Sequence, residues 1–189
     1  MFTSDDAIVY LRPLTEEDVT DRYLAWFRDE EVTKFLESSN LTKADVIAFL
    51  RRGKEGGNYH MYAIVMKDTD THVGNVKIGS IDEHHGVSGM STLIGDRAVW
   101  GRGAGCDAIR IANKIAFDQY GIRKLSAGIY GENIGSIKAY TNAGWVIEGR
   151  QVGQYVVDGE TRDGVLIACF NEKYFKRIND QFVSIGLPQ

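Results

Sequence analysis

Short runs rich in apolar residues, many of them β-branched or aromatic, recur along the chain between polar turn-forming residues, a pattern typical of β-strands. They predict strands over residues 7–14, 59–66, 72–81, 87–95, 124–130, 145–157 and 161–170. The three strands between residues 59 and 95 are expected to form an antiparallel meander. The last two are expected to form a hairpin that turns at Asp158 and Gly159.

Between these runs, apolar residues recur every three or four positions, the spacing of an amphipathic helix. This spacing predicts helices over residues 15–29, 41–53, 106–120, 134–143 and 171–182. Thr15 and Thr42 are the expected N-caps of the first two helices, with Asp45 at the capping-box spacing after Thr42. Gly53 is expected to end the second helix. Strands and helices in this order predict an α/β domain with a mixed sheet.

The composition agrees with one domain. Of 189 residues, 43% are hydrophobic and 25% are charged, which is typical of a globular protein. We expect a single domain over residues 1–189, with a core over about 8–170 and a C-terminal helical appendage over 171–189. The sequence contains no run of about 18 apolar residues that could span a membrane, and no basic start followed by an apolar run that would suggest secretion. We therefore expect a cytoplasmic protein without a membrane partner.

Charge and metal-ligating residues argue against two classes of function. The formal net charge is −4, so the positive surface that nucleic-acid binding requires is not expected. A cationic or amine substrate suits this charge better. The two cysteines and four histidines show no spacing typical of a disulfide framework or a metal site. We expect neither a nucleic-acid partner nor a bound metal.

Three glycines stand at alternate positions in the stretch WGRGAG, residues 100–105, directly before the helix expected from Cys106. A glycine-rich turn before a helix directs backbone N–H groups and the positive end of the helix dipole at one place, where an anion binds well. Arg102 adds a positive charge. Cys106 stands where a dinucleotide-binding fingerprint needs its third glycine, and the chain contains no Walker-type sequence. From the glycines alone, a phosphate site and a plain tight turn both remain open.

A second motif, GENIGSIKAYTNAGW, follows the strand expected at 124–130. Asn133 stands where that strand ends, Ser136 lies in the first turn of the next helix, and Tyr140 lies one turn further on the same face. An amide, a hydroxyl and a phenol would then line one groove. Taken alone, Tyr140 is typical of an ordinary amphipathic helix, but the two motifs together indicate a ligand site.

The two motifs resemble those of the GNAT superfamily of acyl-CoA-dependent N-acetyltransferases, and the resemblance extends from residue 10 to about residue 170. IGDRAVWGRGAGCDAIR is similar to the coenzyme A pyrophosphate motif, and NIGSIKAYTNAGW to the later motif N-x-x-[SA]-x-x-x-Y-x-x-x-G-[FW]. The branch that it resembles includes ribosomal-protein, polyamine and amino-sugar nucleotide acetyltransferases. The resemblance implies an α/β GNAT fold: a mixed, mostly antiparallel sheet of six to seven strands with about four flanking helices, whose central strands splay to admit the coenzyme.

The resemblance also implies acetyl-CoA as co-substrate and assigns roles to residues of this chain. Backbone N–H groups would bind the pyrophosphate at Arg102, Gly103, Ala104, Gly105 and Cys106. The backbone of Leu93 and Ile94 would bind the pantetheine arm, and Asn133 and Ser136 would also contact the coenzyme. Tyr140 matches the general acid, which protonates the leaving thiolate when an amine attacks the thioester.

The resemblance assigns no general base. Many relatives carry a glutamate on the strand before the glycine loop, where Gly89 stands here. Other candidates nearby in the sequence are Glu83, His84, His85 and Ser91. An amine that reaches the site neutral needs no dedicated base.

The acceptor is expected opposite the coenzyme, between residues 24–40 and 153–164. Trp26, Glu37 and Tyr155 are candidates to contact it, through stacking or attraction of an ammonium group. A protein N-terminus, a polyamine or other small amine, and an amino-sugar nucleotide remain open as acceptors, as do a monomer and a homodimer. The alternative to an enzyme is a non-catalytic acyl-CoA-binding sensor or interaction module of the same fold.

Overall fold

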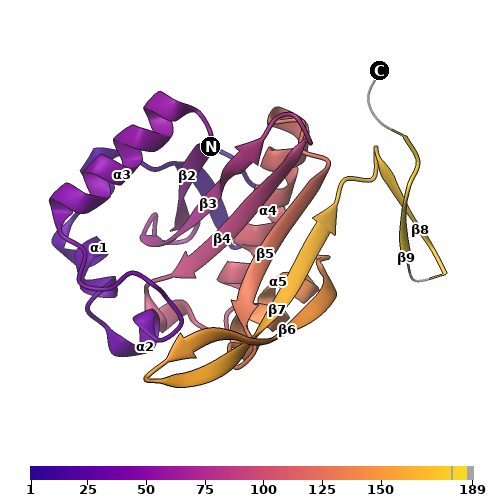
Figure 1. The fold of residues 1–189 in the computed structure, drawn as a ribbon. Helices are drawn as coiled ribbons and strands as arrows, with labels where there is room; N and C mark the ends of the chain where they lie inside the picture. Colours follow the sequence, from indigo (N-terminus) through magenta and orange to yellow (C-terminus); the bar gives the residue numbers. More distant parts are fainter. Residues whose placement is uncertain (180, 187–189) are drawn as a thin grey trace.

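A computed structural model describes residues 1–179 and 181–186. Its main element is a seven-stranded sheet in the order β1-β2-β3-β4-β5-β7-β6 (Figure 1). The strands are β1 (Val9–Pro13), β2 (Tyr59–Met66), β3 (His72–Asp82), β4 (Val87–Ile94), β5 (Lys124–Tyr130), β6 (Val146–Val157) and β7 (Glu160–Phe170). Strands β4 and β5 pair in parallel, and the other neighbours pair antiparallel. The expected meander and the hairpin that turns at Asp158 and Gly159 are confirmed.

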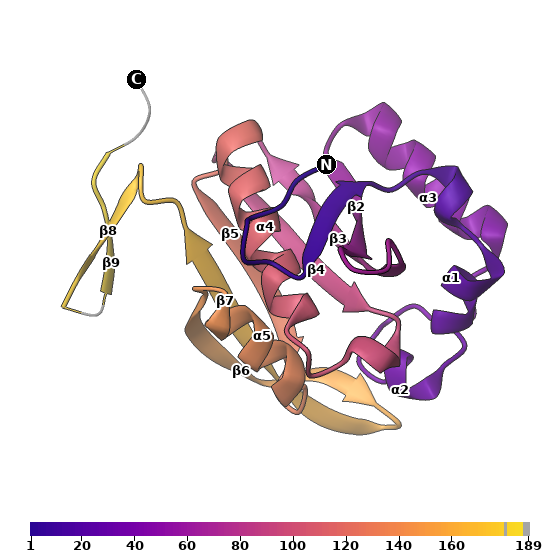
Figure 2. The same ribbon diagram turned by 180° about the vertical axis from the view of Figure 1, so that it is seen from behind.

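Helices cover both faces of the sheet (Figures 1 and 2). They are α1 (Asp21–Trp26), α2 (Glu30–Thr33), α3 (Lys43–Gly56), α4 (Ala104–Gln119) and α5 (Ile134–Asn142). Side chains of β2 point alternately to two apolar clusters, with Ala63 and Val65 facing α1 to α3 and Tyr62 and Ile64 facing α4. In the described part of the chain, no helix is long and apolar enough to cross a membrane.

The central strands β4 and β5 separate along their length. Their parallel pairing is limited to residues 87–89 of β4 and 124–126 of β5. Beyond these residues, β4 stays paired with β3 up to Ile94, and β5 stays paired with β7 up to Tyr130. The strands therefore open a gap at their C-terminal ends, which confirms the expected splay. The two strand edges offer backbone groups to a ligand there.

The single helix expected over residues 15–29 is wrong. The chain instead forms the 3₁₀ helix η1 (Glu16–Asp18), then α1, then α2. A different capping residue starts each of them: Thr15 for η1, Thr20 for α1 and Asp29 for α2. Side chains of this kind bond to nearby backbone N–H groups and favour helix starts over helix interiors. The apolar spacing is compatible with a continuous helix, but the repeated caps divide it.

The expected end of the second helix at Gly53 is also wrong, whereas its start is confirmed. Thr42 and Asp45 form the expected capping box, and α3 continues past Gly53 to Gly56. Gly57 then ends the helix with a positive φ of 67°. A Cβ atom at Gly53 would collide with the ring of Tyr59, so this glycine allows α3 to pack closely on β2.

The C-terminal appendage over residues 171–189 is not helical in its described part. It forms a small antiparallel hairpin of β8 (Phe175–Ile178) and β9 (Gln181–Ser184), which projects away from the sheet (Figures 1 and 2). Asn179 follows β8 with a φ of 47°, a conformation that suits a tight turn and ends a helix. The rings of Phe175 and Phe182 pack on Phe170 at centroid distances of 4.9 and 4.4 Å. Both strands of the hairpin therefore contact one ring at the end of β7, a contact that apolar spacing cannot reveal.

Candidate active site

The glycine-rich loop leads directly into α4. Gly101 and Gly103 have φ angles of 73° and 93°, and a Cβ atom at either position would meet no heavy atom within 4 Å. These angles require glycine for the turn itself. The space beside them leaves the first turn of α4 open, and N–H groups in a first turn have no intrahelical acceptor. The loop is therefore a tight turn that also exposes a helix N-terminus suited to an anion.

Two side chains of the predicted pyrophosphate segment are accessible. Arg102 is exposed, with its guanidinium 3.8 Å from the carboxylate of Asp68. Cys106 is partly exposed, and burial raises the pKa of its thiol, which argues against a reactive thiolate. The segment thus offers a positive charge and no activated nucleophile.

The middle of the segment packs against neighbouring elements. Ala104 is buried, and a Cβ atom on Gly105 would lie 3.5 Å from the side chain of Ile94 on β4 and 4.0 Å from that of Ala139 on α5. These are ordinary contact distances, so Gly105 lies where α4 approaches both β4 and α5. The backbone of this segment, rather than its small side chains, is the part that can bind a ligand.

The end of β4 offers less backbone to the gap than the sequence analysis predicts. A Cβ atom on Gly74 of β3 would collide with the carbonyl oxygen of Leu93, so this oxygen faces β3. The carbonyl of Ile94 accepts a hydrogen bond from the indole N–H of Trp100 at 2.9 Å. Because backbone groups alternate sides along an antiparallel ladder, those of Thr92 face the gap. The carbonyl and N–H of Thr92, and the N–H of Ile94 on the same side of the strand, are therefore favoured over the backbone groups of Leu93 for contacts in the gap.

Tyr140 of α5 lies against β4 at the gap. Its side chain is 3% exposed, and its hydroxyl lies 3.2 Å from Oγ1 of Thr92. The ring packs edge-on against Trp145, with centroids 4.8 Å apart and an interplanar angle of 84°. Burial raises the pKa of the phenol to about 12, against a smaller lowering by the Thr92 hydrogen bond. Tyr140 therefore keeps its proton at neutral pH and presents it at one fixed position.

A buried asparagine of α4 holds this aromatic pair. Asn113 donates from Nδ2 to the carbonyl of Ala143 at 3.2 Å, and its Oδ1 accepts from the indole N–H of Trp145 at 3.0 Å. These bonds tie α4 to the end of α5. They fix the aromatic wall on which the Tyr140 ring rests.

Replacing Asn113 with alanine should lower the free energy of unfolding by about 3 kcal/mol, because the Trp145 indole N–H and the Ala143 carbonyl lose their partners inside the core. Urea denaturation measures this loss. Asn142→Ala, an exposed position at the end of α5, is the matched control and should change the free energy by less than about 0.5 kcal/mol. Equal losses in both variants would contradict the role of Asn113.

Asn133 and Ser136 lie together at the start of α5. The side-chain oxygen of Asn133 accepts a hydrogen bond from the backbone N–H of Ser136 at 3.1 Å and so caps the helix. Its side-chain nitrogen and the hydroxyl of Ser136 are the groups left to contact a ligand. Part of the motif at residues 133–136 therefore serves local structure.

A cleft of about 400 Å³ lies on the other face of the sheet, between β3, β4, α3 and the segment after α2. Thr92 lines this cleft and also contacts Tyr140, so it lies between the cleft and the gap. The other residues that line the cleft are Tyr23, Phe27, Leu36, Glu37, Ser38, Leu41, Asp45, Val46, Phe49, Arg52, Met61, Asn75, Lys77, Ser91 and Leu93. The cleft combines an apolar lining with charged side chains of both signs.

Two of the predicted acceptor residues approach each other. Glu37 lines the cleft, and Tyr155 of β6 stacks on Tyr130 with ring centroids 4.0 Å apart. Burial raises the pKa of Tyr155, and the charges of Tyr130 and Glu37 raise it further. The ring of Phe35, two residues before Glu37, lies 5.8 Å from that of Tyr130, so the segment after α2 lies beside the ring on which Tyr155 stacks.

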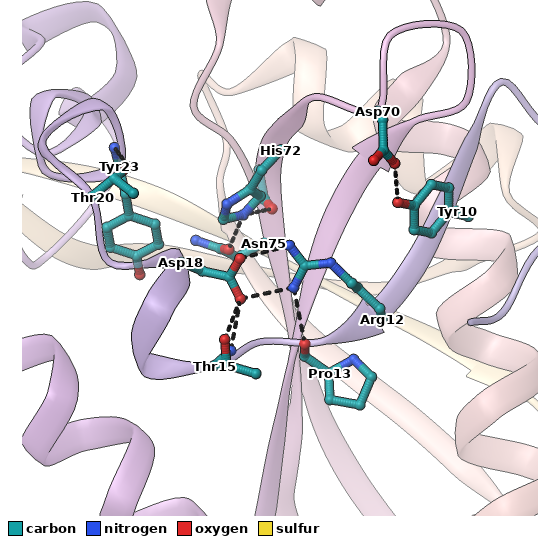
Figure 3. A network of polar contacts seen from close by, with 11 residues as sticks. Tyr10, Arg12, Pro13, Thr15, Asp18, Thr20, Tyr23, Asp70, His72 and Asn75 are labelled. Carbon is teal, nitrogen blue, oxygen red and sulfur yellow. Dashed lines mark hydrogen bonds and ion pairs between the residues drawn. The ribbon is translucent and has the colours of Figure 1, made fainter.

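Trp26, the third predicted acceptor residue, has a packing role in the structure. It is 5% exposed, and a side chain on Gly95 would collide with its indole. Its ring meets His72 edge-on at 5.1 Å. Nε2 of His72 faces the carbonyl oxygen of Gly74 and Oδ1 of Asn75, each at 2.9 Å, and therefore carries a proton (Figure 3). Burial lowers the pKa of this imidazole, so the ring is neutral. His72 and Trp26 line a separate cavity of about 290 Å³, and neither lines the cleft.

The structure explains why Gly89 stands where relatives carry a glutamate. A Cβ atom there would lie 2.9 Å from the carbonyl oxygen of Gly79 on β3, so the close approach of the strands requires glycine. Of the other candidate bases, Ser91 lines the cleft, whereas residues 83–85 lie in an exposed turn at the paired end of β4. Among the described residues, no group of His, Cys, Asp and Glu side chains could hold a metal ion. The general base stays unassigned.

Sequence analysis missed Thr92, Asn75 and Lys77, although each carries a recognisable signal. Each has an apolar neighbour on its strand: Thr92 precedes Leu93, and Asn75 and Lys77 flank Val76. A polar group in a largely buried strand requires a partner. The pattern could have marked them as unusual. Thr92 meets Tyr140 and Lys77 meets Phe49, which come from distant segments and could not be predicted from the pattern, whereas Asn75 meets His72, three residues earlier on the same strand.

Comparisons with known proteins agree with this geometry. Residues 9–146 match the family model described as acetyltransferase (GNAT) domain. An uncharacterized N-acetyltransferase of Bacillus licheniformis, p20, is 26% identical over 171 residues, which cover 88% of this chain and 92% of the relative. The structure of spermidine N-acetyltransferase from Vibrio cholerae in complex with CoA and spermine superposes with a TM-score of 0.78 at 16% identity, over 88% of this chain and 98% of that chain. A GNAT-family acetyltransferase from Bacillus anthracis gives a TM-score of 0.74 at 17% identity, over 90% and 98% of the two chains.

The splayed sheet and these matches define an α/β protein with the fold of the acetyltransferases. The chain belongs to the GNAT family and is an N-acetyltransferase. The expected fold class is confirmed, with five α-helices in the described residues where about four were expected.

Proposed function

We propose that this enzyme transfers an acetyl group from acetyl-CoA directly to a primary amine, with Tyr140 as the general acid. The observation that carries the proposal is the buried, protonated phenol beside Thr92, at the gap between β4 and β5. A proton donor of this kind suits a reaction in which a thiolate leaves.

The residues around the gap fit coenzyme A. The open turn at residues 101–103 and the N-terminus of α4 offer backbone N–H groups for a pyrophosphate. The edges of β4 and β5 offer donors and acceptors to an amide-containing arm that enters like an extra strand. Asn133 and Ser136 supply further polar contacts from α5. Bound there, the coenzyme would supply the acetyl thioester.

Tyr140 provides the proton that direct transfer requires. As the amine nitrogen bonds to the acetyl carbon, the carbon–sulfur bond breaks, and the leaving sulfur takes the proton from the Tyr140 hydroxyl. The amine loses one proton to water, and water returns a proton to the Tyr140 oxygen, so the phenol is restored. This route needs no protein nucleophile, in agreement with the raised pKa of the Cys106 thiol.

The acceptor amine would lie in the cleft, where it reaches the acetyl group past Thr92. Glu37 and the neighbouring Tyr155 suit an ammonium group before it loses its proton. The solved spermidine acetyltransferase with spermine supports an amine as acceptor. Polyamines, amino-sugar nucleotides and protein N-termini are the acceptor classes that we propose. A cytoplasmic location and a monomeric or homodimeric state stay predictions.

A thiol-release assay tests the proposed function. With acetyl-CoA and a panel of spermidine, peptides with free N-termini and amino-sugar nucleotides, we expect thiol release above the amine-free rate for one class, together with an acetylated product by mass spectrometry. If the protein bound coenzyme A but every amine left the rate unchanged, acetyl transfer would be contradicted, and a non-catalytic binding module would be favoured.

A further inference from the structure

One end of the acceptor cleft is positively charged. Lys77 of β3 and Arg52 of α3 both line it. Nζ of Lys77 lies 5.4 Å from the ring centre of Phe49 and 5.0 Å from that of Tyr59. Cζ of Arg52 lies 5.9 Å from the same Phe49 ring. Two cations therefore converge on one aromatic side chain at the surface of the cleft.

No carboxylate neutralises either cation within the part of the chain that the structure describes. Asp45 lines the same cleft, but its carboxylate accepts hydrogen bonds from the backbone N–H and the hydroxyl of Thr42. The contrast with Arg51 is direct, since the guanidinium of Arg51 contacts both carboxylate oxygens of Glu16 at 2.8 Å. Two like charges held near each other favour an anion between them.

The remainder of the cleft has a different character. Glu37 brings a negative charge to the segment after α2, and in the described residues it forms no ion pair. Apolar side chains, including Leu36, Val46 and Met61, also line the cleft. The cleft thus combines two carboxylates, Glu37 and Asp45, with a pair of cations.

We propose that the acceptor carries an anionic oxyacid group, a phosphate or a carboxylate, in addition to its primary amine, and that Lys77 and Arg52 bind this group. This inference rests on the proposed function, because it takes the cleft as the acceptor site. Arg52 offers a planar guanidinium for two parallel hydrogen bonds, and Lys77 offers a compact charge. A polyamine that filled the cleft would instead bring ammonium groups against these two cations, which is unfavourable.

Matched pairs of amines test the anionic group. Glucosamine and glucosamine phosphate differ by a phosphate, and cadaverine and lysine differ by a carboxylate. In thiol release with acetyl-CoA, we expect the anionic member of at least one pair to have a KM at least about tenfold lower than that of its partner. The pair that shows the difference identifies the oxyacid. If kcat/KM for spermidine, glucosamine and cadaverine equalled or exceeded kcat/KM for the anionic amines, the proposal would be overturned.

Charge-removing variants test the two residues. Lys77→Met and Arg52→Gln should each raise KM for the anionic amine about tenfold, leave kcat nearly unchanged and leave KM for its non-anionic partner unaltered. Arg51→Gln removes the same charge from the adjacent position of α3, where the side chain pairs with Glu16 outside the cleft lining, and should alter neither KM. If Arg51→Gln raised KM as much as Arg52→Gln, general charge rather than a binding site would explain the effect, and the proposal would fail.

Binding without turnover separates this inference from the proposed function. Calorimetric titration of the CoA-saturated protein with glucosamine phosphate and with glucosamine reports on the cleft alone. Tighter binding of the phosphate ester that Arg52→Gln abolishes would support the anion site even if no amine released thiol. Thiol release with equal affinity for both sugars, and likewise for lysine and cadaverine, would leave acetyl transfer standing and overturn the anion site.

Discussion

Replacing Tyr140 with phenylalanine should lower kcat for acetyl transfer about 100-fold or more, the usual contribution of a positioned general acid. The phenylalanine ring would keep its packing against Trp145, so the variant loses the hydroxyl that contacts Thr92 and little else. The dissociation constant for acetyl-CoA should therefore change by less than about threefold. Thiol-release kinetics and calorimetric binding of the coenzyme measure the two quantities separately.

Tyr120→Phe is the matched control for this substitution. Its hydroxyl lies 2.5 Å from that of Tyr62 at the C-terminal end of α4, opposite the end that carries the glycine turn, and its removal should leave kcat unchanged. The pH dependence offers a second check. Because burial raises the pKa of Tyr140 to about 12, the phenol stays protonated while the amine loses its proton. The wild-type rate should therefore rise with pH through the neutral range without a decline caused by Tyr140. An unchanged kcat in Tyr140→Phe would contradict the general-acid role.

Replacing Gly103 with valine should weaken acetyl-CoA binding on the order of 100-fold, through the loss of one or two charge-assisted hydrogen bonds to backbone N–H groups. At a φ of 93° the backbone conformation is strained for any side chain, and valine would also occupy the open space before the first turn of α4. Equilibrium titration with acetyl-CoA, followed by calorimetry, measures the loss.

Gly121→Val controls for strain in this experiment. Gly121 follows the other end of α4 with a φ of 64°, and a Cβ atom there also meets nothing within 4 Å. Both variants should lose about 1–3 kcal/mol of stability, and only Gly103→Val should lose coenzyme affinity. Equal losses of affinity would show that strain, rather than a blocked anion site, explains the result.

The order of strands was predictable because strand runs and turn residues are local features. The seven strands of the sheet and the start of α3 at Thr42 follow from such features. The errors arose where a local pattern was compatible with two structures. The apolar spacing at residues 15–29 allowed one helix, but the cap at Thr20 divided it into the 3₁₀ helix η1 and α1, and Asp29 caps the separate α2 that follows. The spacing at 171–182 allowed a helix, but packing on Phe170 and the turn at Asn179 favoured a hairpin.

The proposed coenzyme side was more predictable than the acceptor side for a related reason. The segments at 100–106 and 133–145 keep their residues at fixed intervals along the chain, because a loop with its helix, and a helix with its cap, each form one continuous ligand surface. The acceptor cleft combines side chains from β3, β4, α3 and two loops. Of its predicted residues, Glu37 lines the cleft, whereas Tyr155 stacks on Tyr130 and Trp26 packs against Gly95 and lines a separate cavity.

The sequence by itself determined the class of fold, the glycine turn before α4 and the position of Tyr140 on α5, because each depends on residues within a few positions of one another. Only the tertiary structure decided that Thr92 meets Tyr140, that Asn113 secures Trp145, and that Lys77 and Arg52 converge on Phe49. These contacts join segments separated by many residues, and the energy that selects them comes from burial and from the pairing of polar groups in the folded chain. The chemistry of the leaving group could be predicted from a motif, whereas the chemistry of the acceptor depends on where the sheet and its helices bring distant charges together.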